Sequence, residues 1–240
     1  EARDGLADYF ATRIDKAFFN QIGSHYSQTD TRYTGSNAAI TASGNDSRIY
    51  YGHSTTASLT ASATGFGLTA IDICVEKAQT RTYPMRPLMV NGDQYYVLFI
   101  RPETYTALKT VVSGTSVTWY DVHSNAMRGG QIKQNPIFSG AAGVYNNTII
   151  HVAPNLPTDV GGVAASAGLS VVPAVFCGAQ AAIAAFGKNN GPSQFTWVEE
   201  FFDYENQLGV ASGTIWGLKK SQYNGTDFGT IQVLHTVSTA

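Results

Sequence analysis

Apolar residues recur at spacings of three and four near the start of the chain. This first stripe consists of Leu6, Phe10, Ile14, Ala17, Phe18 and Ile22. Such a period predicts an amphipathic helix, which Gly23 can end. A second stripe predicts another helix over Leu68–Ala78, and Thr69 followed by Asp72 resembles a weakened capping box at its start. Each helix therefore has one face suited to packing.

Short apolar runs rich in β-formers indicate strands. Tyr95–Ile100 and Thr148–Val152 fit buried strands, and Pro102 with Glu103 supplies a helix start between them. We interpret the Ala-rich stretch Val175–Phe186 as a closely packed helix. Turn residues then separate three late strands, as in an antiparallel meander: Phe195–Phe202, Leu208–Leu218 and Phe228–His235. Mixed elements with strands clustered late predict an α+β fold.

Charge is scarce in this 240-residue chain. Charged residues make up 13% of it, against roughly 25% in an ordinary soluble domain. Most polar side chains are uncharged, namely Thr, Ser, Asn, Gln and Tyr. These residues can be buried in an interface without the desolvation cost of Lys or Glu. Two interpretations remain open at this point: a protein with extensive subunit contacts, and a secreted β-rich binding protein.

The formal net charge of −2 excludes a strong overall attraction to nucleic acid. Sequence-specific DNA reading is therefore not expected. The only tight basic pair, Lys219 and Lys220, is interpreted as a solvated strand end, although a surface facing DNA could use it weakly.

The segment Ser24–Gly67 is dominated by small polar residues, Gly and Ala, and predicts a long loop or β-excursion. Its few aliphatic side chains bury too little surface to offset the entropy of ordering it. Four tyrosines suit contact with a neighbour: Tyr26, Tyr33, Tyr50 and Tyr51. We therefore expect intersubunit or exterior contacts here and little contribution to the core.

Several features bear on compartment. Cys74 and Cys177 are isolated, lack metal-site spacing and predict buried thiols, which fits a reducing compartment. The uncharged stretch Gly161–Gly187 contains Pro173 and Gln180, so we interpret it as a buried helix or interface and expect no membrane partner. The chain opens on Glu rather than Met and without a signal-peptide pattern, which predicts a processed or incomplete start.

Two short motifs resemble catalytic or cofactor sites. Gly65–Ala70 matches the G-x-G-x-x-A dinucleotide turn, but a polar run precedes it where a strand is required, so a helix-entry loop is the better interpretation. Ser166 lies in a loosened nucleophile elbow that lacks the first Gly, and no base is placed near it by the sequence.

The carboxylates and histidines also show no pattern typical of a site. Four acids cluster late in the chain, at Glu199, Glu200, Asp203 and Glu205, but a strand points the first two in opposite directions. The histidines, which lack metal-ligand spacing, are His25, His53, His123, His151 and His235. We therefore predict no catalytic residue, no cofactor, no metal and no enzyme activity.

Three ordered segments carry a resemblance to a known family. They are Tyr95–Leu108 (YYVLFIRPETYTAL), Asn135–Val152 (NPIFSGAAGVYNNTIIHV) and Trp197–Thr236, which opens WVEEFFDYENQLGVASGTIWG. In this order and spacing the chain resembles the major capsid proteins of tailed bacteriophages, of the family typified by the N-four-like phage shell protein. The resemblance extends from about Leu68 onward and more loosely to the opening helix, whereas Ser24–Gly67 matches nothing recognisable.

This resemblance implies an α+β fold with a spine helix, a peripheral domain and an axial domain. On that pattern residues 1–82 hold the spine helix, the polar excursion and the second helix, residues 83–194 are mainly axial, and residues 195–240 return to the peripheral domain. The strapping arm and extended loop of the family would precede Glu1.

The implied function is self-assembly into hexamers and pentamers of an icosahedral shell that encloses double-stranded DNA without sequence preference. The implied partners are copies of the chain itself with scaffolding, portal and cement proteins. The implied location is the virion, assembled in the bacterial host cytoplasm. The alternatives are a secreted adhesin, favoured if Tyr26–Tyr51 lines a pocket, and a serine hydrolase centred on Ser166.

Overall fold

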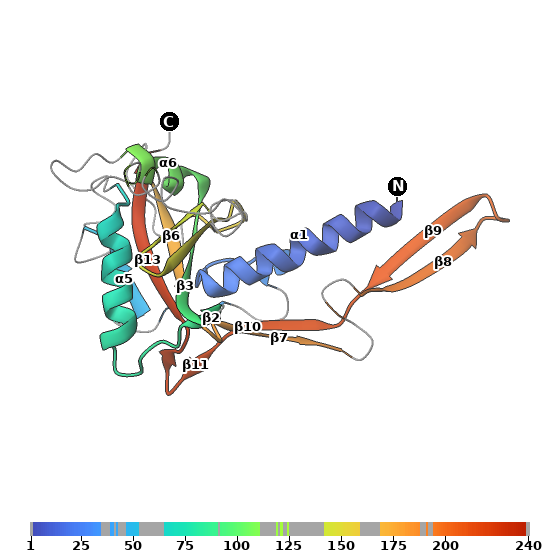
Figure 1. Cartoon of the computed structure of the whole chain (residues 1–240). Helices are drawn as coiled ribbons and strands as arrows, with labels where there is room; N and C mark the ends of the chain where they lie inside the picture. Colours follow the sequence, from blue (N-terminus) through green and yellow to red (C-terminus); the bar gives the residue numbers. More distant parts are fainter. Residues whose placement is uncertain are drawn as a thin grey trace.

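A computed structural model shows a compact body from which a long helix and a β-ribbon project (Figure 1). The structure describes residues 2–34, 39–40, 42, 47–52, 65–90, 92–110, 119, 121, 124, 142–158, 169–187, 191 and 194–238. The projecting helix is α1 (Ala2–Ile22), and the ribbon is formed by β8 (Thr196–Phe202) and β9 (Gln207–Gly213). Both leave the body on the same side, with the N-terminus and the ribbon tip far from the sheet.

The body is built on a seven-stranded mixed sheet in the order β1-β13-β6-β3-β5-β4, with β2 paired to β3. Its strands are β1 (Arg48–Tyr50), β2 (Leu88–Val90), β3 (Asp93–Ile100), β4 (Gly143–Tyr145), β5 (Thr148–Val152), β6 (Leu169–Cys177) and β13 (Thr230–Ser238). The pairs β1–β13 and β3–β5 are parallel and the others antiparallel. Two body helices accompany it, α5 (Leu68–Thr80) and α6 (Pro102–Thr110).

The sheet is covered on both faces. Helix α5 packs on one face, where Ile71 and Cys74 join a cluster with Leu98, Phe176 and other buried side chains. The end of α1 packs on the opposite face, where Phe19 and Ile22 contact a cluster with Val175 and Cys177. Because successive residues of a strand point to opposite faces, β6 must be apolar at every position near its end.

The predicted helix over Val175–Phe186 is wrong. These residues form the end of β6, a turn at Ala179 and Gln180, and strand β7 (Ala182–Phe186). A continuous apolar run fits a strand buried on both faces as well as it fits a helix. Pro173 is tolerated in β6 because β3 pairs only with Val175–Cys177, so at the proline the strand has a partner on one side alone.

The predicted meander of late strands is also wrong. Only β8 and β9 pair as consecutive long strands, whereas β10 (Trp216–Lys220) pairs with β7 and β13 pairs with β6. A small hairpin of β11 (Gln222–Tyr223) and β12 (Thr226–Asp227) lies between them. The late strands therefore reach back to partners earlier in the chain, which local turn signals do not indicate.

Several sequence-based elements are confirmed. The opening helix ends at Ile22, and a Cβ on Gly23 would lie 2.7 Å from the Phe19 carbonyl oxygen, which explains the glycine. The structure also has the predicted strands β3 and β5 and a helix starting at Pro102. The Thr69–Asp72 capping box is not formed, because the N-cap of α5 is Gly67, without a side-chain cap. A further short helix, α2 (Thr31–Thr34), follows α1.

Parts of the Ser24–Gly67 excursion belong to the core, contrary to expectation. Strand β1 lies at the edge of the central sheet, Ser47 is fully buried, and Phe66 packs against Tyr51 and His235. Residues 35–38, 41, 43–46 and 53–64 of this segment lie outside the described residues. The central sheet thus draws strands from all three of the segments 1–82, 83–194 and 195–240.

The interpretation of Lys219–Lys220 as a solvated strand end holds for Lys219 only. Lys220 is buried and its Nζ lies 2.7 Å from both Asp227 Oδ2 and Ser24 Oγ. Gln222 donates to the other Asp227 oxygen at 2.8 Å, so this carboxylate is paired on both sides. Burial lowers the pKa of Lys220, while the nearby Asp227 charge opposes that shift. These hydrogen bonds of Lys220 link Ser24, which follows α1, to β10 and β12.

His235 is fully buried in β13. Its Nε2 lies 2.8 Å from Thr104 Oγ1 of α6, and its ring lies against Phe66. Burial lowers its pKa to about 4, because the apolar surroundings disfavour the charged imidazolium. The histidine is therefore neutral in the folded protein at neutral pH.

We predict that Lys220→Met destabilises the fold by about 3–5 kcal/mol, because it leaves the buried Asp227 carboxylate without its cation. The exposed neighbour gives a matched control: Lys219→Met should change the free energy of unfolding by less than about 0.5 kcal/mol. Urea denaturation of both variants measures the difference. A Lys220→Met protein as stable as Lys219→Met would contradict the buried ion pair.

The depressed pKa of His235 predicts acid sensitivity. An unfolded histidine binds a proton below about pH 6.5, whereas His235 in the folded state does so only near pH 4. Stability is therefore fully present above about pH 6.5 and falls as the pH drops toward 4, by about 2 kcal/mol between pH 7 and pH 5. Urea midpoints at several pH values test this. In His235→Phe the dependence should flatten over that range, and an unchanged slope would be evidence against this role.

Candidate functional site

The β8–β9 ribbon exposes large apolar side chains along its whole length. Every residue of β8 is exposed, including Trp197 at 40% and Phe201 at 64%. Leu208 of β9, directly opposite Phe201, is 57% exposed. Such residues are unusual on a free surface when they are contiguous. The ribbon therefore has the composition of a surface that another molecule covers.

Both faces of the ribbon carry this apolar surface. Trp197, Phe201 and Leu208 share one face by strand alternation and cross-strand register. Val198 and Phe202 lie on the other face, where the Phe202 ring rests on the space left by Gly209: a Cβ there would lie 2.5 Å from the ring. A two-stranded ribbon without a core is at best marginally stable in water. Cover by a neighbour would stabilise it.

The carboxylate cluster lies on this ribbon and at its tip. Glu199 and Glu200 occupy successive, opposed positions of β8, as the sequence predicts, and Glu199 forms an ion pair with Arg3 of α1 in the same chain. Asp203 and Glu205 lie in the turn between the strands. No group of three or more potential metal ligands occurs among the described residues.

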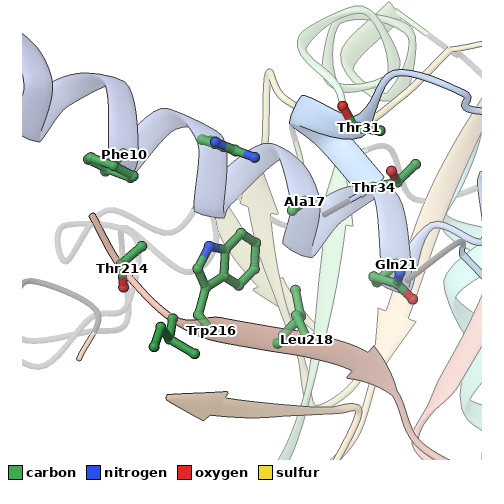
Figure 2. Close-up of a pocket in the computed structure, with 11 residues that line it drawn as sticks. Phe10, Ala17, Gln21, Thr31, Thr34, Thr214, Trp216 and Leu218 are labelled. Atoms are coloured by element: carbon green, nitrogen blue, oxygen red, sulfur yellow. The ribbon is translucent and has the colours of Figure 1, made fainter. Parts of the chain in front are cut away.

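A cleft of about 360 Å³ lies between α1 and β10 (Figure 2). Trp216 rises from β10 toward the helix, and Phe10 and Ala17 face the cleft from α1. Polar residues complete the lining, namely Arg13, Gln21, Thr31, Thr34 and Thr214. Arg13 Nε and Thr214 Oγ1 are buried and find no hydrogen-bond partner among the residues that the structure describes. The lining of the cleft is therefore largely polar, with apolar parts that include the rings of Phe10 and Trp216.

The other candidate residues are not brought together. Gly65–Gly67 leads into α5 with Phe66 buried, in agreement with a helix-entry loop. His25 contacts Asn20, His151 packs near Phe99, and His235 is in the core. His53, His123 and Ser166 lie outside the described residues.

The two cysteines are buried free thiols, as predicted, and burial raises the pKa of each to about 12. Both thiols therefore stay protonated and unreactive at neutral pH. Of the helices that the structure describes, none combines the length and apolar character needed to cross a bilayer.

A family model described as "phage capsid protein" matches residues 1–239. The chain belongs to this family. The major capsid protein of Pseudomonas phage KPP25 is 28% identical over 261 residues, a match that covers 97% of this chain and 66% of that protein. The chain thus spans just under two thirds of its capsid relative's length.

Solved phage capsids share the fold. The capsid of Ralstonia phage GP4 superposes with a TM-score of 0.77 at 29% identity, covering 99% of this chain and 67% of that one. The capsid asymmetric unit of cyanophage Pam1 gives a TM-score of 0.70 at 18% identity, covering 100% and 69%. The α+β fold expected from the family resemblance is therefore confirmed as a phage capsid fold.

The exposed ribbon and the cleft were missed by reasoning from the sequence. The run Trp197–Phe202 has the composition of a β-strand, and only the structure shows that both of its faces are exposed. One signal was present: apolar and aromatic residues occur at consecutive positions, without the alternation of a strand buried on one face.

Proposed function

We propose that this chain is the shell-forming region of a major capsid protein, which self-assembles into hexamers and pentamers of an icosahedral shell around double-stranded DNA. The observation that carries the proposal is the family match over residues 1–239. The exposed apolar ribbon supports it, because such a surface suits a subunit that is covered by its neighbours.

A closed shell fits the low charge of this protein. Each subunit touches several neighbours, so many modest contacts add up to a stable particle and no single site must bind tightly. Uncharged polar residues are suited to such contacts, because they lose less on desolvation than Lys or Glu. The net charge of −2 agrees with enclosing DNA without sequence recognition.

The architecture suggests how the domains divide. We assign α1, the β7–β10 pair and the β8–β9 ribbon to the peripheral part, with α1 as part of the spine helix. The sheet with α5 and α6 is the axial part. This differs from the division at residues 82 and 194, because β1 and β13 lie in the same sheet as β3 and β6. Scaffolding, portal and cement proteins remain proposed partners, and the virion, assembled in the host cytoplasm, the proposed location.

Assembly can be tested on the purified protein. We expect sedimentation and negative-stain electron microscopy to show closed particles or capsomer-sized rings of the complete capsid protein. A species that stays monomeric at all concentrations, with its fold intact by circular dichroism, would overturn the proposal.

The ribbon predicts a separation of folding from assembly. The triple variant Trp197→Ser, Phe201→Ser, Leu208→Ser should unfold within about 1 kcal/mol of the parent, since these side chains are already exposed. Particle yield should fall severalfold, because the apolar contact area with neighbours is lost.

A matched control keeps the apolar area: Trp197→Phe, Phe201→Tyr, Leu208→Met should assemble nearly as well as the parent. Light scattering against concentration measures yield for both sets. Equal yields from the serine and the conservative variants would show that the ribbon lies in solvent in the particle.

A further inference from the structure

Within the described residues, an arginine that lines the α1–β10 cleft has a buried N–H without a hydrogen-bond partner. The residue is Arg13 of α1, and the buried atom is its Nε. No ion pair to Arg13 occurs in the part of the chain that the structure describes. The Arg13 charge helps to lower the pKa of Asp30. The Asp30 carboxylate, however, already forms an ion pair with Arg32, with 2.5 Å between Oδ2 and Nη2. A buried guanidinium N–H left unpaired is costly, and an acceptor entering the cleft would relieve that cost.

The residues that line the cleft indicate what kind of chemical group it can bind. Phe10 stacks on Phe195 and lines one side, and Trp216 stands across from α1. Thr214 Oγ1, which is buried and has no partner in the described ranges, adds a hydroxyl to the lining. Such a site suits an aromatic ring accompanied by a carboxylate, because the ring can pack against Phe10 and Trp216 while the carboxylate accepts from Arg13.

The tip of the β8–β9 ribbon presents this combination. Asp203, Tyr204 and Glu205 are consecutive, and Tyr204 is completely exposed. All three have left-handed backbone angles, with φ of 49°, 55° and 71°. Positive φ values are common in tight hairpin turns, and here the turn holds the three side chains at the end of the ribbon.

We propose that the Asp203–Glu205 tip of one copy docks in the α1–β10 cleft of another copy. A tip carboxylate accepts a hydrogen bond from Arg13, and the Tyr204 ring enters between Phe10 and Trp216. The tip of the same chain cannot do this, because the ribbon carries it beyond the free end of α1, away from the cleft (Figure 1). This inference rests on the proposed self-assembly and names one of its contacts.

The contact is heterologous, since tip and cleft are different surfaces of the same chain. Repetition of a heterologous contact closes into rings when the rotation allows it. The tip therefore adds directional links between copies, in which one charge pair and one aromatic ring set the register. Glu199, further back on the ribbon, is already paired with Arg3 of the same chain.

A charge exchange tests the ion pair. Arg13→Glu alone and the double variant Asp203→Lys, Glu205→Lys should each raise the concentration needed for assembly by about tenfold or more, as expected for losing a close charge pair. Combining all three changes restores opposite charges and should recover most of the loss. Lys219→Glu, an exposed charge on β10 outside the cleft, is the matched control and should have no such effect.

Site-specific crosslinking tests the docking directly. Tyr204→Cys combined with Thr34→Cys at the cleft should give covalent ladders of subunits when particles are treated with a short bis-maleimide. Tyr204→Cys combined with Met89→Cys, an exposed position on β2, should not. The native Cys74 and Cys177 are buried and will not compete.

The outcomes separate the two proposals. Ladders from the Tyr204–Thr34 pair together with rescue by charge exchange support docking. Parent particles that form normally, but give no ladder with this pair, overturn docking and leave self-assembly standing. A parent protein that forms no particles overturns both.

Discussion

The structure depends on burial of the central sheet from both sides. Strand β6 lies between α5 on one face and the end of α1 on the other, so its consecutive apolar residues are all removed from water. Each large apolar side chain buried in this way contributes about 1.5–3 kcal/mol. The same contact fixes the long helix, because Phe19 and Ile22 are buried against Val175 and Cys177. The free part of α1 projects from an anchored end.

This arrangement leaves a subunit that is incomplete by itself. The projecting parts are long and have little core. Among the described strands, β8 and β9 pair only with each other, and β7 pairs only with β10. Large apolar side chains are exposed at consecutive positions of β8, such as Phe201 and Phe202, whereas the body has a buried core. In a monomer, the exposed apolar side chains of the ribbon would add no burial free energy. On the proposed function, neighbouring copies supply the missing second layer, so the same apolar burial that stabilises the body also stabilises the assembly.

The sequence predicts those elements whose signals are local. Helix α1 and strands β3 and β5 follow from periodicity and from Gly23 and Pro102. Prediction from the sequence fails where contacts with residues far away in the chain determine the local structure. Val175–Phe186 becomes strand because β13, β3 and β10 pair with it, and Lys220 is buried because Asp227 and Ser24 lie beside it. The candidate cleft likewise joins residues about 200 positions apart, a distance that no local pattern spans.

Hydrogen bonds at the end of α1 form a polar junction that fixes the direction in which the helix projects from the body. Where α1 ends, Gln232 of β13 donates to the Gly23 carbonyl oxygen at 2.6 Å and Lys220 of β10 binds Ser24 at 2.7 Å. Apolar packing alone is non-directional and would let the helix slide on the sheet, whereas these buried hydrogen bonds have fixed lengths and angles. The body, the helix end and the β10 arm meet at this point. The positions of the cleft and of the ribbon tip relative to the body therefore depend on this junction.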